Sequence, residues 1–310
     1  MPERPEASLG LPLDGRPAVV TVGTFDGVHL GHWAVLQEIK ARAKARGGRS
    51  ILVTFDPHPL QVVRPAEAPL LLTTREEKRE ILAESGLEYA VFLAFTAVLR
   101  EMSPRAFVRD VLLAKLGMDE LVIGYDHGFG RGRSGDVETL RNIASEEGFR
   151  LDVVDPVEIE GQRPSSSAVR RALQAGDLEV ANRALGRPYG LRGEVVHGEG
   201  RGHTLGFPTA NLRVGDEKLV PAPGIYAVWV HHPRGRSMGA LHVGPRPTFP
   251  GSPPTVEVFL LDFEGDLYHR SLRLDFIQYL RPVEPFTTVE ALVARMEADV
   301  VRVRERLGRA

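Results

Sequence analysis

The sequence predicts two domains of different classes: an N-terminal α/β domain with a parallel sheet, followed by a small antiparallel β-barrel with a C-terminal helix. Three observations predict this order. The first half alternates short apolar runs with amphipathic segments, the pattern of a doubly wound α/β domain. After Gly186 the chain is rich in Gly and Pro, and its extended runs have no helices between them, which favours a barrel. From Thr288 onward, apolar residues recur at helical spacing, which predicts a closing helix.

The strands of the first half are expected to be buried on both faces, because their apolar runs are almost continuous. They are predicted at residues 18–23, 50–55, 89–94, 121–124 and 151–154. Helix starts can be recognised between them. Ser103 followed by Pro104 is a helix cap with Pro at the first helical position, and Thr74 precedes two acids that suit the positive end of a helix.

The strands of the second half are predicted at residues 190–196, 225–231, 238–243, 255–263 and 272–280. Their side chains alternate between two faces. In the fourth of these strands, Val256, Val258 and Leu260 share one face, and Glu257 lies on the other. We place the domain boundary near Arg187, which gives domains of residues 1–186 and 187–310.

The composition excludes several classes of function. The formal net charge is −2 and both signs are mixed along the chain, so no basic face for nucleic acid is expected. There is no cysteine, which excludes disulfides, thiolate metal sites and cysteine nucleophiles. The first 13 residues lack the apolar segment of a secretory signal, and no apolar run approaches the roughly 20 residues that cross a bilayer. A soluble, cytoplasmic protein is expected.

The first cluster of candidate functional residues follows the first predicted strand and opens the first helix. His29 and His32 are three residues apart and face the same way. Gly-rich backbone next to a helix N-terminus favours phosphate, so imidazole donors there suit a nucleotidyl transfer. Two alternatives stay open: the histidines hydrogen-bond to structure, or they bind a metal, for which His58 is the one nearby third ligand.

A second cluster lies at residues 197–211. Its glycines, which include Gly200, Gly202 and Gly206, allow backbone N–H groups to wrap phosphates. Thr209 and Asn211 offer neutral oxygens of the kind that complete a Mg²⁺ shell beside ATP. No G-x-x-x-x-G-K-[ST] loop occurs, which excludes a P-loop kinase.

A third cluster is the hydroxyl-rich string between Arg163 and Arg170. Ser166, Ser167 and two guanidinium groups at a helix start form an anion site; the alternative is a serine-rich helix cap with solvated arginines. Asp126 is expected at the carboxyl end of a strand, where ligands bind in open α/β sheets. The G-x-G-x-x-G match at residues 130–135 lies well past the first strand–helix turn and is not interpreted as a dinucleotide fingerprint.

These motifs resemble those of the bacterial bifunctional riboflavin kinase/FMN adenylyltransferases, also called FAD synthetases. The resemblance runs from about residue 20 to residue 286. Four blocks resemble the Rossmann-like adenylyltransferase part: G-x-F-D-G-x-H-x-G-H at residues 23–32, T-F-D-P-H-P at 54–59, G-Y-D-H-G-F-G at 124–130 and R-P-S-S-S-A-V-R at 163–170. The signature G-F-P-T-A-N at residues 206–211, with flanking blocks at 224–227 and 244–249, resembles the riboflavin kinase part.

The resemblance implies two consecutive ATP-dependent reactions: riboflavin to FMN in the second domain, and FMN to FAD with release of pyrophosphate in the first. Mg²⁺ is implied for both. It implies that His29, His32 and Glu257 are catalytic, with Glu257 as the base for the ribityl hydroxyl. The implied ATP-binding residues of the adenylyltransferase are Gly23, Phe25, Asp26, Gly31, Asp126, Arg163, Ser166, Ser167 and Arg170. Those of the kinase are Gly200, Gly202, Gly206 and Pro208, with Thr209 and Asn211 at the metal.

The chain departs from the family pattern at His127, His242, His269 and Val283. The last of these could change how the C-terminal helix closes the flavin site. Two rivals stay open: an adenylyltransferase with another acceptor, against which the G-F-P-T-A-N block argues, and a non-catalytic flavin store. The expected partners are small molecules; the sequence does not give the oligomeric state.

Overall fold

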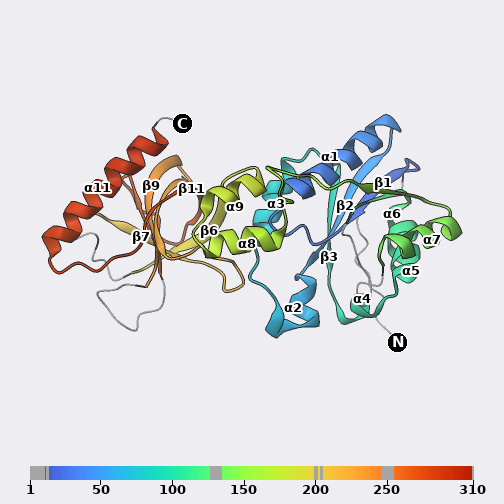
Figure 1. Cartoon of the computed structure of the whole chain (residues 1–310), viewed down its shortest axis with the longest axis horizontal. Helices are drawn as coiled ribbons and strands as arrows, with labels where there is room; N and C mark the ends of the chain where they lie inside the picture. The colour runs from blue at the N-terminus through green and yellow to red at the C-terminus, as the bar shows by residue number, and fades with distance from the viewer. Residues whose placement is uncertain are drawn as a thin grey trace. The chain divides into compact units, whose positions relative to one another are not determined.

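The computed structural model describes residue 11 and residues 14–125, 135–198, 202, 205–245 and 255–308. Asp126, His127 and Gly200, and the end of the block at 244–249, lie outside them. The chain forms two compact units, shown in Figure 1. Unit 1 comprises Met1–Pro69 and Lys78–Pro164, and unit 2 comprises Leu70–Glu77 and Ser165–Ala310.

Unit 1 contains a five-stranded sheet in the order β3-β2-β1-β4-β5, and every neighbouring pair is parallel. The elements between β1 and β5 are β1 (Ala18–Val22), α1 (Leu30–Ala45), β2 (Arg49–Asp56), α2 (Pro59–Val63), the 3₁₀ turn η1 (Pro65–Glu67), α3 (Arg75–Ala83), β3 (Tyr89–Ala94), α4 (Ala97–Glu101), α5 (Pro104–Phe107), the π-helical segment η2 (Val108–Leu113), α6 (Ala114–Leu116), β4 (Met118–Gly124), α7 (Val137–Glu147) and β5 (Arg150–Val154).

Helices cover both faces of this sheet, as the apolar runs predict. On one face the side chains of α1 pack with Val19, Leu52 and Val122 of the central strands. On the other face the residues of α5, η2 and α7 pack with the alternate side chains of the same strands. Ser103 caps α5 by accepting a hydrogen bond from the Ala106 amide, and Pro104 occupies the first turn, as expected.

Unit 2 is a closed, antiparallel six-stranded barrel in the order β10-β7-β6-β11-β8-β9. Its elements are α8 (Ser166–Gln174), α9 (Leu178–Leu185), β6 (Tyr189–Val196), β7 (Thr209–Arg213), β8 (Gly224–His232), β9 (Gly235–Gly244), β10 (Thr255–Leu260), β11 (Ser271–Arg281) and α11 (Val289–Leu307). The fold class is therefore confirmed in both parts, including the closing helix.

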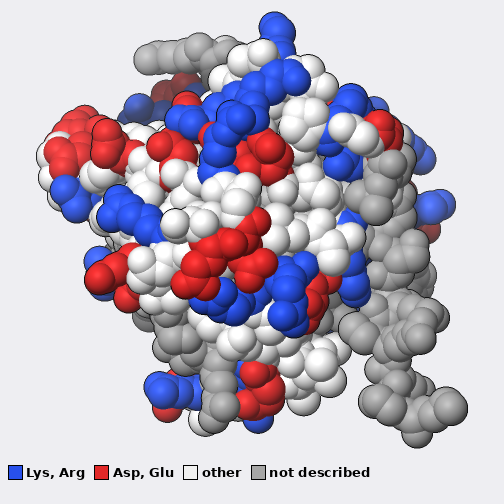
Figure 2. Space-filling model, turned by 90° about the vertical axis from the view of Figure 1, so that its right-hand side faces the viewer, with Lys and Arg blue, Asp and Glu red and all other residues white. Residues whose placement is uncertain are grey.

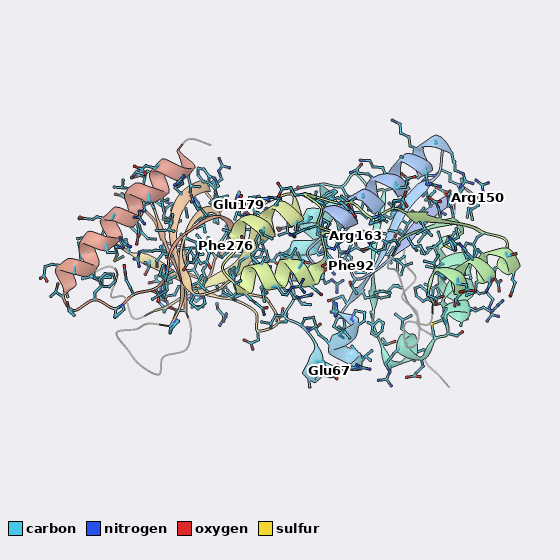
Figure 3. The ribbon with its side chains drawn as sticks, viewed as in Figure 1. Glu67, Phe92, Arg150, Arg163, Glu179 and Phe276 are labelled. Carbon is cyan, nitrogen blue, oxygen red and sulfur yellow. The ribbon has the colours of Figure 1, made fainter. Side chains whose placement is uncertain are left out.

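The barrel interior is apolar and contains Phe276, labelled in Figure 3, and the Val256, Val258 and Leu260 side chains predicted to share a face. Helix α11 covers part of the barrel exterior, where Val303 and Leu307 pack on Ala227. A buried ion pair between Arg281 and Asp299, 2.6 Å from Nη2 to Oδ2, fixes α11 to the end of β11.

Two features of unit 2 differ from the sequence prediction. β7 was not among the predicted strands, because its polar residues Thr209 and Asn211 hide the strand pattern. The strand expected at residues 255–263 ends at Leu260, and the chain turns at Asp262, whose φ is 55°.

The segment Leu70–Glu77, from the first half of the sequence, belongs to unit 2. The Leu71 amide donates to Glu217 O (2.7 Å), and the Leu219 amide donates to Leu71 O (2.8 Å). This backbone pairing fixes the segment to the barrel loop before β8.

Candidate active sites

In unit 1 the two histidines form a reciprocal helix cap. His29 is the N-cap of α1, and its Nδ1 accepts a hydrogen bond from the His32 amide (3.4 Å). His32 Nδ1 accepts one from the His29 amide (3.3 Å). The rings stack with centroids 3.7 Å apart and planes 23° apart. Because each Nδ1 is an acceptor, these bonds assign the imidazole proton to Nε2 in the neutral rings.

One of the two alternatives that the sequence left open, hydrogen bonding of the histidines within the protein, is therefore present, and the geometry is also compatible with the nucleotidyl-transfer interpretation. The rings do cap the helix, and they present Nε2–H donors at a helix N-terminus, where phosphate is favoured. A metal site of the type considered with His58 has no counterpart in the part of the chain that the structure describes: no group of three His, Cys, Asp or Glu residues there is placed to hold a metal ion. His58 itself caps α2.

The neighbouring residues of the block are explained by packing around these rings. Phe25 is buried and lies 4.5 Å from the His32 ring centroid. A Cβ on Gly23 would meet the Phe25 ring at 2.9 Å, and a Cβ on Gly31 would meet His29 Cε1 at 3.1 Å. Asp26 is also buried, with 1% of its surface exposed. The close approach of the Phe25 and His29 rings thus explains why glycine is required at both positions, even in the absence of a bound ligand.

The end of unit 1 returns to the histidine helix. The carbonyl of Pro164 lies 3.6 Å from the position of a Cβ on Gly31, so the chain just before the hydroxyl-rich string lies beside the helix start. Arg163, labelled in Figure 3, lies over the Tyr125 ring at 5.1 Å and pairs with Glu158 at 3.2 Å. The structure thus brings Arg163 to the carboxyl end of β4.

The remaining residues of that string start α8 and belong to unit 2. Ser165 is the N-cap and accepts from the Ala168 amide, so Ser166 and Ser167 occupy the first helical turn. Arg170 Nε donates to Leu70 O (2.8 Å). The serine-rich cap, the alternative considered for this string, is present, and a role for Ser166, Ser167 and Arg170 in binding ATP stays a prediction.

Sequence reasoning missed one charged residue of unit 1. Lys78 is buried, with 6% of its surface exposed, and its Nζ donates to Thr24 O (2.7 Å). Burial lowers the pKa of the Lys78 ammonium, while the nearby carboxylates of Asp26 and Asp56 act in the opposite direction. One signal was available: in α3 Lys78 lies one turn before the buried Leu82, on the face that packs inward.

In unit 2 the predicted kinase residues meet through strand register. Glu257 on β10 is paired with Asn211 on β7 and with His242 on β9. All three point away from the barrel interior, because their neighbours along each strand are the residues that pack into the core. Thr209 Oγ1 lies 3.5 Å from Glu257 Oε2. His242, one of the positions where the chain departs from the family pattern, is therefore a direct neighbour of the predicted base Glu257.

A second hydroxyl orients Glu257. Thr255 Oγ1 donates to Glu257 Oε1 (2.8 Å), and sequence reasoning missed this residue because a strand threonine gives no distinctive signal. Phe259, two residues beyond Glu257, packs edge-to-face against Phe207 of the signature block, with centroids 5.2 Å apart. This contact holds the exposed Pro208 and the turn at Gly206 (φ 81°) next to β10.

Gly198 and Gly202 lie in close contact with the side chains of the candidate metal-binding residues. A Cβ on Gly198 would overlap the Asn211 carboxamide, with its Cγ at 2.5 Å. A Cβ on Gly202 would come within 3.1 Å of Thr209 Oγ1 and would clash with the Phe207 carbonyl. Backbone, rather than side chain, must therefore lie next to Thr209 and Asn211.

The other two departures lie at the edge of this unit. His269 is exposed, has a φ of 60°, and places Nδ1 3.5 Å from Glu194. At Val283 no acid is present, but the next residue, Glu284, pairs with Arg281 at 3.2 Å. The acid one position later thus joins the ion pair that fixes α11.

Positive and negative residues are mixed along the sequence, and one face of the structure shows the same mixture (Figure 2). On the face drawn in Figure 2, Lys and Arg are interspersed with Asp and Glu. In the part of the chain that the structure describes, no helix combines the length and apolar character needed to cross a membrane.

Comparison with known proteins relates both halves of the chain to one family of bifunctional enzymes. Residues 12–168 match the FAD synthetase family, and residues 185–307 match the riboflavin kinase family. Bifunctional riboflavin kinase/FMN adenylyltransferases are similar along nearly the whole chain. The protein of Listeria monocytogenes is 37% identical and that of Pseudomonas fluorescens 39%, and the alignments cover 91% and 93% of this chain and 90% and 93% of theirs.

A solved structure has the same overall fold. The crystal structure described as a macrolide-efflux protein from Streptococcus pneumoniae matches with a TM-score of 0.84 and 29% identity, over 96% of both chains. Together with the two family matches in sequence, these similarities identify the chain. It belongs to the family of bifunctional riboflavin kinase/FMN adenylyltransferases, with the FAD synthetase part in its first half and the riboflavin kinase part in its second.

Proposed function

We propose that the histidine cluster of unit 1 carries out FMN adenylylation and that the Thr209–Asn211–Glu257 cluster of unit 2 carries out riboflavin phosphorylation. The observation that carries the proposal is that each cluster of functional groups lies in the part of the chain whose family catalyses the matching reaction. Paired Nε2–H donors at a helix N-terminus lie in the FAD synthetase part, and a carboxylate beside a hydroxyl and an amide lies in the riboflavin kinase part. We keep residues 186/187 as the proposed boundary between the two activities.

In adenylyl transfer, a phosphate oxygen of FMN attacks the α-phosphorus of ATP while the bond to the bridging oxygen breaks and pyrophosphate leaves. Negative charge grows on the bridging oxygen and the β-phosphate. His29 and His32 donate Nε2–H hydrogen bonds to these oxygens, and the helix dipole acts in the same direction. No covalent intermediate with the protein is needed, because holding the two phosphates in line supplies much of the rate.

In phosphoryl transfer, the ribityl 5′-hydroxyl of riboflavin attacks the γ-phosphorus of ATP and ADP leaves. Glu257 accepts the hydroxyl proton. Thr255 holds Oε1, so the orientation of the carboxylate is fixed before substrate binds. Gly198 and Gly202 bring backbone directly against the metal-binding residues, and backbone N–H groups of this glycine-rich loop hold the phosphate oxygens.

Mg²⁺ fits the residues of unit 2. The Thr209 hydroxyl and the Asn211 amide supply hard, neutral oxygen donors, which are ligands that Mg²⁺ accepts next to nucleotide phosphates. The ion would neutralise phosphate charge there. The described histidine cluster offers nitrogen rather than oxygen donors, so in unit 1 we assign Mg²⁺ to ATP itself. With riboflavin, FMN and ATP as substrates and no cysteine in the chain, we propose a cytoplasmic enzyme.

The test separates the half-reactions. Purified protein is incubated with Mg²⁺–ATP and either riboflavin or FMN, and the flavins are separated and quantified. We expect FMN and then FAD from riboflavin, and FAD from FMN. FMN without FAD would leave only the kinase and point to another adenylyl acceptor. Flavin that is bound but never converted would support the flavin store instead.

A further inference from the structure

The loop that leads from β1 to His29 is held in an unfavourable backbone conformation. Phe25 has a φ of 47° and Val28 a φ of 41°, with Gly27 at 80° between them. Positive φ is rare for a large aromatic residue and a true outlier for a β-branched one. Such residues persist only where the surrounding structure fixes them, and they cluster at functional sites.

Two kinds of contact fix this loop. Phe25 and Val28 are anchored by burial, with 4% and 0% of their surfaces exposed. At the start of the loop, the Thr24 carbonyl accepts two hydrogen bonds, from Thr54 Oγ1 (3.0 Å) and from Lys78 Nζ (2.7 Å). The donors come from β2 and α3, so one carbonyl joins the loop to two other elements.

Of these two donors, Lys78 carries a cost that packing alone does not require. A buried ammonium is disfavoured unless charge and hydrogen bonds offset the loss of water. Its charged neighbours are the carboxylates of Asp26, inside the loop, and Asp56, at the carboxyl end of β2. Both acids lie at the edge of the sheet where ligands of open α/β folds bind, so without a cation they would repel a nucleotide phosphate.

We propose that Lys78 is a positioning residue for adenylyl transfer: its ammonium holds the Thr24 carbonyl, and with it the strained loop that sets His29 at the helix cap, while its charge offsets Asp26 and Asp56. This inference rests on the adenylyltransferase assignment of unit 1. Lys78 acts through the loop and the electrostatic field, and it takes no part in bond making.

Three variants separate the hydrogen bond from the charge. Lys78→Met keeps the length of the side chain and removes both. Lys78→Arg keeps the charge and a donor. Thr54→Val, the matched control, removes the other hydrogen bond to the same carbonyl without changing charge. For each variant, kcat and KM of FMN adenylylation are measured from neutral to alkaline pH. Riboflavin kinase activity and thermal unfolding are measured on the same preparations.

Lys78→Met is expected to lower the kcat of adenylylation about 10- to 100-fold, the scale of a hydrogen bond from a charged group. Thr54→Val should lower it less, and kinase activity should be unchanged in both. In the wild type, adenylylation should decline at alkaline pH below the range where exposed lysines titrate, because the lowered pKa makes Lys78 lose its proton early. Lys78→Arg should retain activity and extend it to higher pH, because guanidinium stays charged.

Wild-type kcat in Lys78→Met would overturn the proposal, and so would an alkaline decline in Lys78→Arg identical to that of the wild type. If Lys78→Met does not fold, Lys78→Arg and the wild-type pH profile still decide. A wild-type protein that makes no FAD from FMN would instead refute the adenylyltransferase assignment, which is a separate outcome.

Discussion

The two candidate sites are assembled in different ways. In unit 1, His29 and His32 are three residues apart, and one helix start sets their geometry, because each ring accepts a hydrogen bond from the amide of the other histidine. In unit 2, Thr209 and Glu257 are 48 residues apart and meet because β10 pairs with β7 in one register. A slip of one residue would turn Glu257 to the other face of the strand. The first site is thus encoded locally, and the second depends on the whole barrel.

The two units also use a buried lysine differently. Lys218 of unit 2 donates to Leu72 O (2.6 Å), to Gly190 O (2.8 Å) and to Glu77 Oε2 (2.7 Å). All three ammonium hydrogens are used, and the carboxylate is a direct partner, so Lys218 holds the Leu70–Glu77 segment to the barrel. Lys78 instead donates to a strained loop, and its carboxylates act from nearby. Lys218 is therefore a structural cation of unit 2, whereas Lys78 is placed to support the histidine site of unit 1.

The largest effect is expected at the centre of the non-local site. Glu257→Gln keeps the shape of the side chain but cannot accept the ribityl proton, so the kcat of riboflavin phosphorylation should fall about 10²- to 10⁴-fold. FMN adenylylation should not change. Glu179→Gln is the control: this exposed acid on α9, labelled in Figure 3, pairs with Arg183 one helical turn away, and such surface pairs contribute little to stability. Loss of both activities would make Glu257 structural.

The local site is tested by separating the two roles of His29. His29→Asn retains a good helix cap, because Asn is among the preferred N-cap residues, but it lacks the distal N–H donor. The kcat of adenylylation should fall about 10²- to 10³-fold, as when one donor to a developing charge is removed. FMN should then accumulate from riboflavin, while the melting temperature stays near that of the wild type.

His29→Ala, which removes the cap as well, should lower both adenylylation and thermal stability. Loss of the helix cap alone should lower the free energy of unfolding by about 1 kcal/mol. Wild-type FAD formation in His29→Asn would show that capping is the only function of this histidine.

The same contrast explains how much of the molecule could be predicted from the sequence. Features set by neighbouring residues were predicted: the cap at Ser103, the alternation around Val256 and Val258, and the orientation of the two histidines. Features set by partners far along the chain were not. β7 was hidden because Thr209 and Asn211 face outward between apolar neighbours, in a strand of five residues.

The contribution of Leu70–Glu77 to unit 2 could not be predicted, because the partners of that segment lie more than 100 residues away. Lys78 and Thr255 were missed for another reason: neither residue type is distinctive where it stands in the sequence. A lysine on an inward helix face or a threonine on a strand is ordinary until the group that it contacts is known. The positions of Asp126 and Gly200 relative to the two sites stay predictions.

A smaller effect is expected where the glycine loop touches the non-local site. In Gly198→Ala, the new Cβ would overlap the Asn211 carboxamide and displace it. A shift of about 1 Å in a positioning group can cost on the order of 10²-fold in rate, so kinase activity should fall by up to that factor while adenylylation is retained. Gly190→Ala is the control, because its Cβ would meet only Leu274 O at 4.0 Å. Equal effects in both variants would contradict the role given to Gly198.

The smallest effect is expected from the hydroxyl that orients the base. Thr255→Val keeps the β-branched shape and strand preference of threonine but removes the hydrogen bond to Glu257 Oε1. The kcat of the kinase should fall about tenfold or less, which corresponds to roughly 1.5 kcal/mol for a hydrogen bond to a charged group. The KM for ATP should change little, because Thr255 acts on the carboxylate and not on the nucleotide.

A double-mutant cycle makes this last comparison decisive. If Thr255 acts only through Glu257, then Thr255→Val should have no further effect in the Glu257→Gln background. An additive loss would mean that Thr255 affects the site by another route, through β10 or the Gly244 carbonyl that also faces its hydroxyl. The barrel site would then depend on the position of the strand as a whole, whereas the histidine site would still depend on a single helix start.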